Sequence, residues 1–377
     1  MLKLTHRRSF TAMVFTLVAS WLIFFAAAMH AEAEILIEDA AGRSVRLQSP
    51  AKRIVLNESL LLLSLALIDR DPVARIAGWA SPQRIDQGIY DAFRQKFPSI
   101  DQVPTVGALQ PGQASAETII GVKPDLFVVN QWQVGWEDTT RLLEAAGIPV
   151  IFLDGPRNDE RNVVEATTFS IDLLGKAIGR DAQAAEYTQF VRDHYGVITR
   201  SLEDINRPTT VLVDGFANST CCSTPGRNNR MTQNIALAGG VSIGAEAVPG
   251  YEGKLNPEYV LKANPKVYIA TGTPKATSET ALIVGGGISE DLARASLRKV
   301  VSETVRRDLT AVHDKRAYGI SHQASISALN ILIVECFAKW LHPERFSHID
   351  PNQTLAEINQ RFLAVPLNGT FWIDLGQ

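Results

Sequence analysis

The feature that most constrains the fold is an alternation of short apolar strands and amphipathic helices, which occurs twice along the chain. The first series runs from RIVLN, at residues 53–57, to a strand that ends at Asp154, and the second begins with TTVLVDG at residues 209–215. Strands that alternate with helices predict parallel sheets whose two faces are covered. Between the two series lies a helical pattern that is interrupted near Gly175 and Gly179.

This organisation predicts an α/β protein with two Rossmann-like lobes, each built on a central parallel sheet, joined by a long α-helix. The 377 residues are enough for two domains. An internal repeat supports the two lobes, because Ser115-Ala-Glu117 opens a helix before KPDLFVV and Asn256-Pro-Glu258 opens a helix before NPKVYIA. We expect an N-terminal lobe at residues 34–158, a helical linker region with the backbone helix at 159–206, and a C-terminal lobe at 207–377.

Residues 1–33 have the pattern of a signal peptide for export. A positively charged start is followed by a long apolar stretch and by small residues at Ala31 and Ala33. We therefore expect cleavage after Ala33 and a periplasmic mature protein. Both the Sec route and the twin-arginine route stay open, because Arg7 and Arg8 precede the apolar stretch. An uncleaved membrane anchor is the alternative, although the stretch is barely long enough to span a bilayer.

The composition and the motifs argue against two classes of function. The net charge is −3, and no basic run with interleaved aromatic residues is present, so nucleic-acid binding is not expected. The sequence contains no H-E-x-x-H or P-loop motif. We therefore expect a protein that is not an enzyme and holds no resident cofactor.

The candidate binding residues follow the predicted strands, because ligands of open parallel sheets bind beyond the carboxyl ends of the strands. Tryptophan rings and amides at these ends suit a large polar organic chelate, and an arginine fork suits its carboxylates. The alternatives are core packing for the tryptophans, a solvated charge for the arginine and a satisfied loop residue for the histidine. The candidates are Asn57, Trp79, Gln110, Asn130, Trp132, Cys221, Cys222, Arg227, Thr273 and His322.

The adjacent cysteines, Cys221 and Cys222, stand apart from Cys336, which lies in an apolar helical pattern. A bridge between neighbours closes almost no loop, so it would add little chain stability. Because a periplasm is oxidising, we expect a vicinal disulfide that forms a stiff apolar knob beside the ligand. A free pair packed in the loop and a soft-metal site are the alternatives. A cysteine nucleophile with His322 as its base is a remote one.

Taken together, several segments resemble the periplasmic substrate-binding proteins of ABC importers for iron–siderophore complexes, haem and cobalamin. The segments are IEDAAGRSVRLQSPAKRIV, SAETIIGVKPDLFVV, AGIPVIFLD, NPEYVLKANPKVYIATG and AKWLHPERFSHIDPNQTLAEINQRFL, and their order and spacing carry the similarity. CCSTPGRNN followed by LAGGVSIGAEAVPG is similar to a subgroup for iron-complex or metal uptake.

The resemblance implies a function in import. It implies a monomer that captures a ferric siderophore between two lobes and delivers it to an inner-membrane permease with its cytoplasmic ATPase. It also implies that Glu117 and Glu258 dock on the permease, although glutamates also favour helix N-termini for electrostatic reasons alone. Haem, cobalamin and a bare zinc or manganese ion are the alternative ligands. A bare ion is disfavoured because the predicted N-terminal lobe contains no histidine.

Overall fold

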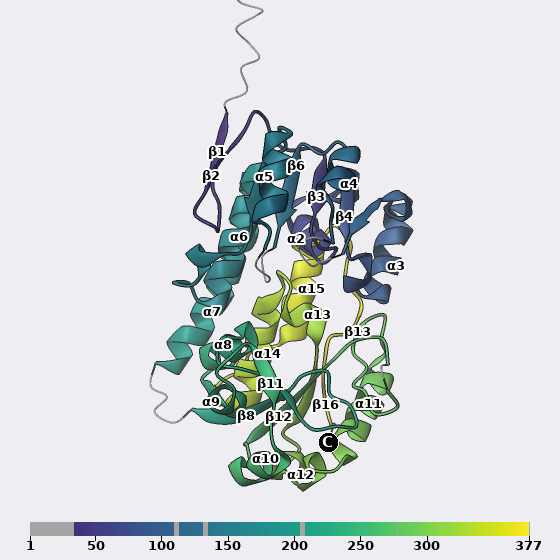
Figure 1. Ribbon diagram of the computed structural model, residues 1–377. Helices are drawn as coiled ribbons and strands as arrows, with labels where there is room; N and C mark the ends of the chain where they lie inside the picture. Colours follow the sequence, from purple (N-terminus) through teal and green to yellow (C-terminus); the bar gives the residue numbers. More distant parts are fainter. Residues whose placement is uncertain (1–33, 109–112, 131–134, 204–207, 277, 377) are drawn as a thin grey trace, which may run out of the picture.

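The computed structural model in Figure 1 describes residues 34–108, 113–130, 135–203, 208–276 and 278–376. In the N-terminal half of this described part, five parallel strands pair in the order β5-β4-β3-β6-β7. We call this sheet and its helices the N-lobe. Its strands are β3 (Ile54–Leu56), β4 (Ile76–Ala80), β5 (Thr105–Gly107), β6 (Leu126–Val129) and β7 (Val150–Phe152), and its helices are α2 (Leu61–Ile68), α3 (Gln87–Lys96), α4 (Ala116–Gly121) and α5 (Glu137–Ala145). A hairpin of β1 (Ile35–Glu38) and β2 (Ser44–Leu47) precedes them.

The second half, which we call the C-lobe, repeats this plan with one change. Its described strands pair in the order β10-β8-β12-β14-β16, and the last strand runs antiparallel to the rest. The strands are β8 (Thr209–Asp214), β10 (Gly240–Ser242), β12 (Val267–Gly272), β14 (Ala317–Ser321) and β16 (Trp372–Asp374). The helices are α8 (Arg230–Leu237), α9 (Ile243–Ala247), α10 (Pro257–Ala263), α11 (Glu290–Ser302), α12 (Thr310–His313) and α13 (His322–Ser325). Two short antiparallel pairs lie outside the sheet: β9 (Ser223–Pro225) with β11 (Glu252–Lys254), and β13 (Gly285–Gly286) with β15 (Gly369–Thr370).

The linker region folds as two helices, α6 (Val163–Ile178) and α7 (Asp181–Leu202). Asn162 starts α6 with a capping box to Glu165, and Gly179 ends it in the left-handed conformation. The predicted interruption is therefore a turn between two helices. Figure 1 shows α6 beside the N-lobe and α7 continuing toward the C-lobe.

The largest cluster of buried apolar residues joins the two lobes, and a smaller cluster lies within each lobe. The shared cluster runs from β3 and α2 through α6, α7 and α14 (Asn330–Leu341) to strands β8 and β12 of the C-lobe. The C-terminal helix α15 (Pro351–Arg361) leads into a segment whose Ala364 N–H donates to the Ala66 carbonyl of α2. The predicted fold class, two α/β lobes with central parallel sheets and a helical connection, is confirmed. Among the described residues, no helix combines the length and the hydropathy that a membrane crossing requires.

Candidate functional site

A cavity of about 880 Å³ lies between the two lobes. Loops that follow β3, β4, β6 and β7 form one wall, and loops that follow β8, β12 and β14 form another. This position agrees with the rule that open parallel sheets bind ligands beyond the carboxyl ends of their strands. The volume lies toward the upper end of the range that is usual for small-molecule sites, about 300–1,000 Å³.

The N-lobe wall is organised around the buried carboxylate of Glu58, which follows β3 and is 1 % exposed. The Asn130 amide donates to one of its oxygens at 2.6 Å, and Arg84 Nε donates to the other at 2.8 Å. Behind them, Asn57 exchanges two hydrogen bonds with the main chain of Asn130. These contacts join the ends of β3, β4 and β6 and fix the direction of Arg84 at the cavity.

The C-lobe wall places an aromatic pair beside that arginine. Phe216 adopts a left-handed conformation with φ of 49°, and its N–H donates to the Thr271 hydroxyl at 2.8 Å. Its ring lies 4.3 Å from the imidazole of His322 between centroids. Burial, and then the nearby Arg84 charge, lower the pKa of His322 to about 4. The imidazole is therefore neutral at physiological pH and offers one donor and one acceptor.

A third side of the cavity is formed by β9 and the loop that leads into α8. Arg230, at the start of α8, pairs with Asp154, which follows β7, at 2.5 Å. This ion pair crosses the cavity from one lobe to the other. Asp154 also accepts hydrogen bonds from the Asn158 amide and the Gly155 N–H, each at 2.9 Å, so its position is fixed on the N-lobe side.

The charges that line the cavity balance. Four arginines reach it, and so do four carboxylates, which are Glu58, Asp154, Asp159 and Glu252. The arginines are Arg84, Arg161, Arg227 and Arg230. Three large apolar side chains that are exposed in this structure, Phe216, Tyr251 and Ile326, line the same space. The cavity therefore suits a large ligand with apolar faces, polar edges and a low net charge.

The structure joins Cys221 and Cys222 in a disulfide. The pair does not line the cavity: Cys222 is 1 % exposed, and both residues pack in the core of the C-lobe. Strand β9, which begins at the next residue, reaches the cavity instead. Direct contact of the cysteines with a ligand, as the sequence suggested, is therefore corrected to support of the cavity wall from behind.

A buried ion pair fixes the loop before the cysteines. Arg306 and Asp214 are 0 % and 1 % exposed, and Arg306 Nε donates to the Asp214 carboxylate at 2.7 Å. Arg306 also donates to the carbonyls of Asn218 and Thr220 at 2.7 and 3.0 Å. Tyr268 completes the network with a hydrogen bond of 2.8 Å to Asp214. Loop 215–222 is thereby tied to the core.

Among the described residues, one group of His, Cys, Asp and Glu side chains is close enough to hold a metal ion, namely Asp214, Cys221 and Cys222. Its sulfur atoms are bonded to each other, and its carboxylate is paired with Arg306. These residues do not fit a metal ion.

The other predicted ligand-binding residues are placed as follows. Asn130, Arg227 and His322 line the cavity, whereas Asn57 lies one layer behind it. Trp79 is 2 % exposed and packs in the core beside Tyr90, with ring centroids 6.4 Å apart, so it follows the core-packing alternative. Thr273 does not line the cavity, and its hydroxyl donates to the Lys275 carbonyl. Gln110 and Trp132 lie outside the described residues.

Sequence reasoning missed several cavity residues, among them Glu58, Arg84, Phe216 and Arg230. Each of these four lies within a few residues of a strand end or of the cysteine run, so the strand-end rule points to all four. Two of them were passed over because a nearby residue in the sequence drew the prediction instead. Trp79 was chosen near Arg84, and the cysteine pair was chosen near Phe216.

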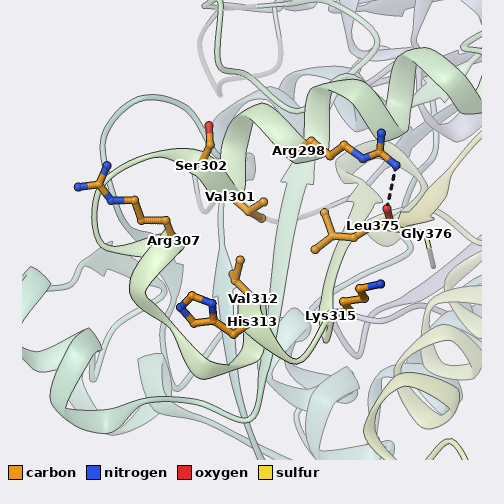
Figure 2. A pocket seen from close by; sticks show the side chains of 9 residues that line it. All are labelled: Arg298, Val301, Ser302, Arg307, Val312, His313, Lys315, Leu375 and Gly376. Carbon is orange, nitrogen blue, oxygen red and sulfur yellow. Dashed lines mark hydrogen bonds between the residues drawn. The ribbon is translucent and has the colours of Figure 1, made fainter.

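A second hollow, of about 550 Å³, lies on the C-lobe (Figure 2). Arg298 and Ser302 of α11 line it together with Arg307, His313 and Lys315. Arg298 Nη2 donates to the Leu375 carbonyl at 3.3 Å. These side chains come from one lobe only and from the segments that precede β14, at the opposite end of the sheet from the cavity.

Glu117 and Glu258 lie outside the cavity, at matching places in the two lobes. Each is the second residue of its helix, in α4 and in α10. A hydrogen bond from its own main-chain N–H, and then one from the Ser115 side chain, lower the pKa of Glu117. The Glu258 N–H donates to its capping residue, Asn256, at 2.8 Å.

The protein is similar to several known binding proteins. A cobalamin-binding protein from Halobacterium salinarum is 26 % identical over 284 residues, which cover 70 % of this chain and 69 % of that one. The structure of the TroA-like periplasmic binding protein FepB from Veillonella parvula has 26 % identity and a TM-score of 0.81, covering 91 % of this chain and 100 % of that chain. The molybdate-bound structure of MolA, a periplasmic binding protein from Haemophilus influenzae, has 16 % identity and a TM-score of 0.67, covering 89 % and 99 %, which shows the fold alone.

Residues 54–322, which include both sheets apart from the edge strand β16, match the periplasmic binding protein family. The resemblance drawn from the sequence is therefore confirmed: the chain belongs to the periplasmic binding protein family.

Proposed function

We propose that this protein, a solute-binding protein and not an enzyme, captures a ferric siderophore in the cavity between its lobes. It then delivers the complex to an inner-membrane ABC permease coupled to a cytoplasmic ATPase. The family implies an exported periplasmic protein, and we propose that residues 1–33 are the signal that directs it there. Glu117 and Glu258 contact the permease in this proposal.

One observation carries the ligand class: the cavity of about 880 Å³ has balanced charges and three exposed apolar side chains. A ferric trihydroxamate has an apolar periphery and little net charge, so it matches this lining. A ferric tricatecholate carries three negative charges, and the balanced lining offers no net positive charge to compensate them. Arg227 is exposed and makes no ion pair within the described residues, so it is available for an oxygen of the ligand.

Isothermal titration calorimetry tests this proposal with five compounds: a ferric trihydroxamate, a ferric tricatecholate, haem, cyanocobalamin and zinc chloride. We expect the trihydroxamate to bind at least about tenfold more tightly than the tricatecholate, a difference of about 1.4 kcal/mol. Arg227→Gln should weaken its binding, whereas Arg307→Gln, far from the cavity, should not. Tight zinc binding without a response to any chelate would overturn the ligand class.

Cobalamin is the second candidate. The matched Halobacterium salinarum protein is described as cobalamin-binding, and the similarity covers 70 % of this chain. The neutral imidazole of His322 and the ring of Phe216 give the cavity one nitrogen donor and one flat apolar face, both of which suit a corrin. Tighter binding of cyanocobalamin than of the trihydroxamate in the same titration selects this candidate.

A further inference from the structure

Helices α4 and α10 correspond residue by residue, and the correspondence includes more than the two glutamates. Both helices begin with a capping side chain, Ser115 or Asn256. In both, the glutamate is the second helical residue, a fully buried aliphatic follows two residues later, and an exposed aliphatic comes next. The buried residues are Ile119 and Val260, each 0 % exposed, and the exposed ones are Ile120 and Leu261, at 38 % and 42 %.

The match continues beyond the helices without an insertion. Lys123 and Asn264 end the two turns in the left-handed conformation, with φ of 51° and 40°. Strands β6 and β12 then begin at equivalent positions, and each pairs in parallel with the first strand of its sheet, β3 or β8. The two segments are therefore equivalent units of the two lobes.

Each glutamate and its exposed aliphatic residue face the same side of their helix. Residues three apart on a helix are neighbours, with Cβ atoms about 5–6 Å apart. Glu117 therefore lies beside Ile120, and Glu258 lies beside Leu261. Each lobe thus presents one carboxylate next to one aliphatic side chain, and Figure 1 shows the two helices far apart, α4 on the N-lobe and α10 on the C-lobe.

We infer that Ile120 and Leu261 are contact residues for the permease, in addition to the two glutamates. This inference rests on the proposed import function and adds the chemistry of the partner. The carboxylate requires a basic side chain on the partner, and the aliphatic side chain requires an apolar recess beside it. Because the two units are equivalent, the partner presents this surface twice, as a two-fold symmetric pair of membrane subunits does.

The test compares variants that do not touch the cavity. Ile120→Ser and Leu261→Ser, combined, remove the aliphatic side chains but keep both glutamates. Leu36→Ser and Leu292→Ser, combined, are the matched control, because these leucines are 53 % and 45 % exposed on β1 and α11. Ile120→Val with Leu261→Ile is the conservative pair. Calorimetry should give the same ligand affinity for all of these proteins.

The readout is ligand uptake by spheroplasts of the source organism from which the gene for this protein has been deleted. The spheroplasts receive purified protein together with radioactive ferric trihydroxamate, or with radioactive cyanocobalamin if calorimetry selects that ligand. The serine pair should raise the protein concentration for half-maximal uptake about tenfold, the usual scale for an interface contact that matters. The control pair should match the wild type, and the conservative pair should stay close to it. The loss should persist at about 0.5 M KCl, because salt screens charges but not apolar contacts.

Two outcomes overturn the inference and are distinguishable. If the wild type supports uptake and the serine pair does so equally well, the import function stands and the aliphatic contacts are wrong. If the wild type binds the ligand but restores no uptake, the import function itself is wrong, and the inference is wrong with it.

Discussion

At the scale of single residues, the polar side chains of the cavity are positioned by other polar side chains. The Glu58 carboxylate accepts hydrogen bonds from Asn130 and Arg84. The Asp154 carboxylate accepts hydrogen bonds from Asn158 and Arg230. Such networks orient a binding site because their hydrogen bonds restrict the directions that the carboxylates can take. Among the described lining residues there is one histidine, His322, and the Arg84 charge adds to the burial that lowers its pKa.

His322 should stay neutral across the physiological range. Its folded pKa of about 4 lies below the ordinary value of 6.5, so the unfolded chain binds the proton more readily. The contribution of His322 to folding is therefore complete above pH 6.5 and is lost as the pH falls toward 4. NMR titration should place its midpoint near 4. His194, whose pKa is raised by its hydrogen bond to Glu335, should titrate above 6.5 in the same spectra. A midpoint of His322 near 6.5 would contradict its burial.

The ion pair between Asp154 and Arg230 should control the opening of the cavity more than it controls stability. Arg230 is 40 % exposed in its side chain, so removing the pair should change the free energy of unfolding by less than about 1 kcal/mol. Asp154→Asn should nevertheless increase the radius of gyration of the ligand-free protein in small-angle X-ray scattering. Asp138→Asn, which breaks an exposed pair within α5, is the control. Equal radii for both variants would exclude this role.

Much of the site was predictable from strand ends, but side-chain directions were not. Asn130, Arg227 and His322 line the cavity as the rule suggests, whereas Trp79 turns into the core. The end of a strand determines where a residue lies, and packing against neighbours such as Tyr90 determines which way its side chain points. The single sequence contains no information on that second step.

At the scale of elements, the segment between β8 and β9 depends on a helix turn far along the chain. Arg306 lies in a 3₁₀ turn, η6 (Arg306–Asp308), and binds both Asp214 at the end of β8 and the carbonyls of loop 215–222. The alternating pattern of the sequence predicted the strands and helices themselves. It did not predict the contacts of Arg306, because an arginine in RRDLT has no local feature that marks it as buried.

Removing Arg306 should be one of the most damaging single changes in the protein. Arg306→Met leaves Asp214 buried without a counter-charge, and breaking a buried ion pair in this way costs about 3–5 kcal/mol. Urea denaturation measures the loss. Arg307→Gln, next to it and 60 % exposed in its side chain, should change stability by less than about 0.5 kcal/mol. The double variant Asp214→Asn with Arg306→Met should recover part of the loss, and the same loss in both would refute the charge argument.

At the scale of the whole molecule, the lobes are joined by more than the helical linker. The Gly286 N–H of β13 donates to Asp86, the capping residue of α3, at 3.0 Å. At the other side, Lys96 donates to the Ala364 carbonyl, and Arg70 donates to the carbonyls of Leu363 and Arg361. With one apolar cluster running through both lobes, these contacts favour small closing motions over wide hinge opening.

The contact between the C-terminal segment and the N-lobe should be essential for stability. Ala364 is 2 % exposed, and its N–H bonds to the Ala66 carbonyl. Ala364→Pro removes that donor and should lower the free energy of unfolding by about 2 kcal/mol, the scale of an unsatisfied buried polar group. Ala364→Ser, which keeps the N–H, should lose much less in the same urea denaturation. Equal losses would show that side-chain volume, and not this hydrogen bond, matters there.

The return of the C-terminal segment to α2 also bears on how the protein is made. Synthesis is vectorial, so the N-lobe emerges long before the residues that complete its packing at Arg70 and Lys96. The first half of the nascent chain must therefore wait, incompletely packed, until the last residues have been synthesised. Export by the Sec route, which carries unfolded chains, would benefit from that delay, whereas export by the twin-arginine route, which carries folded proteins, would have to follow it.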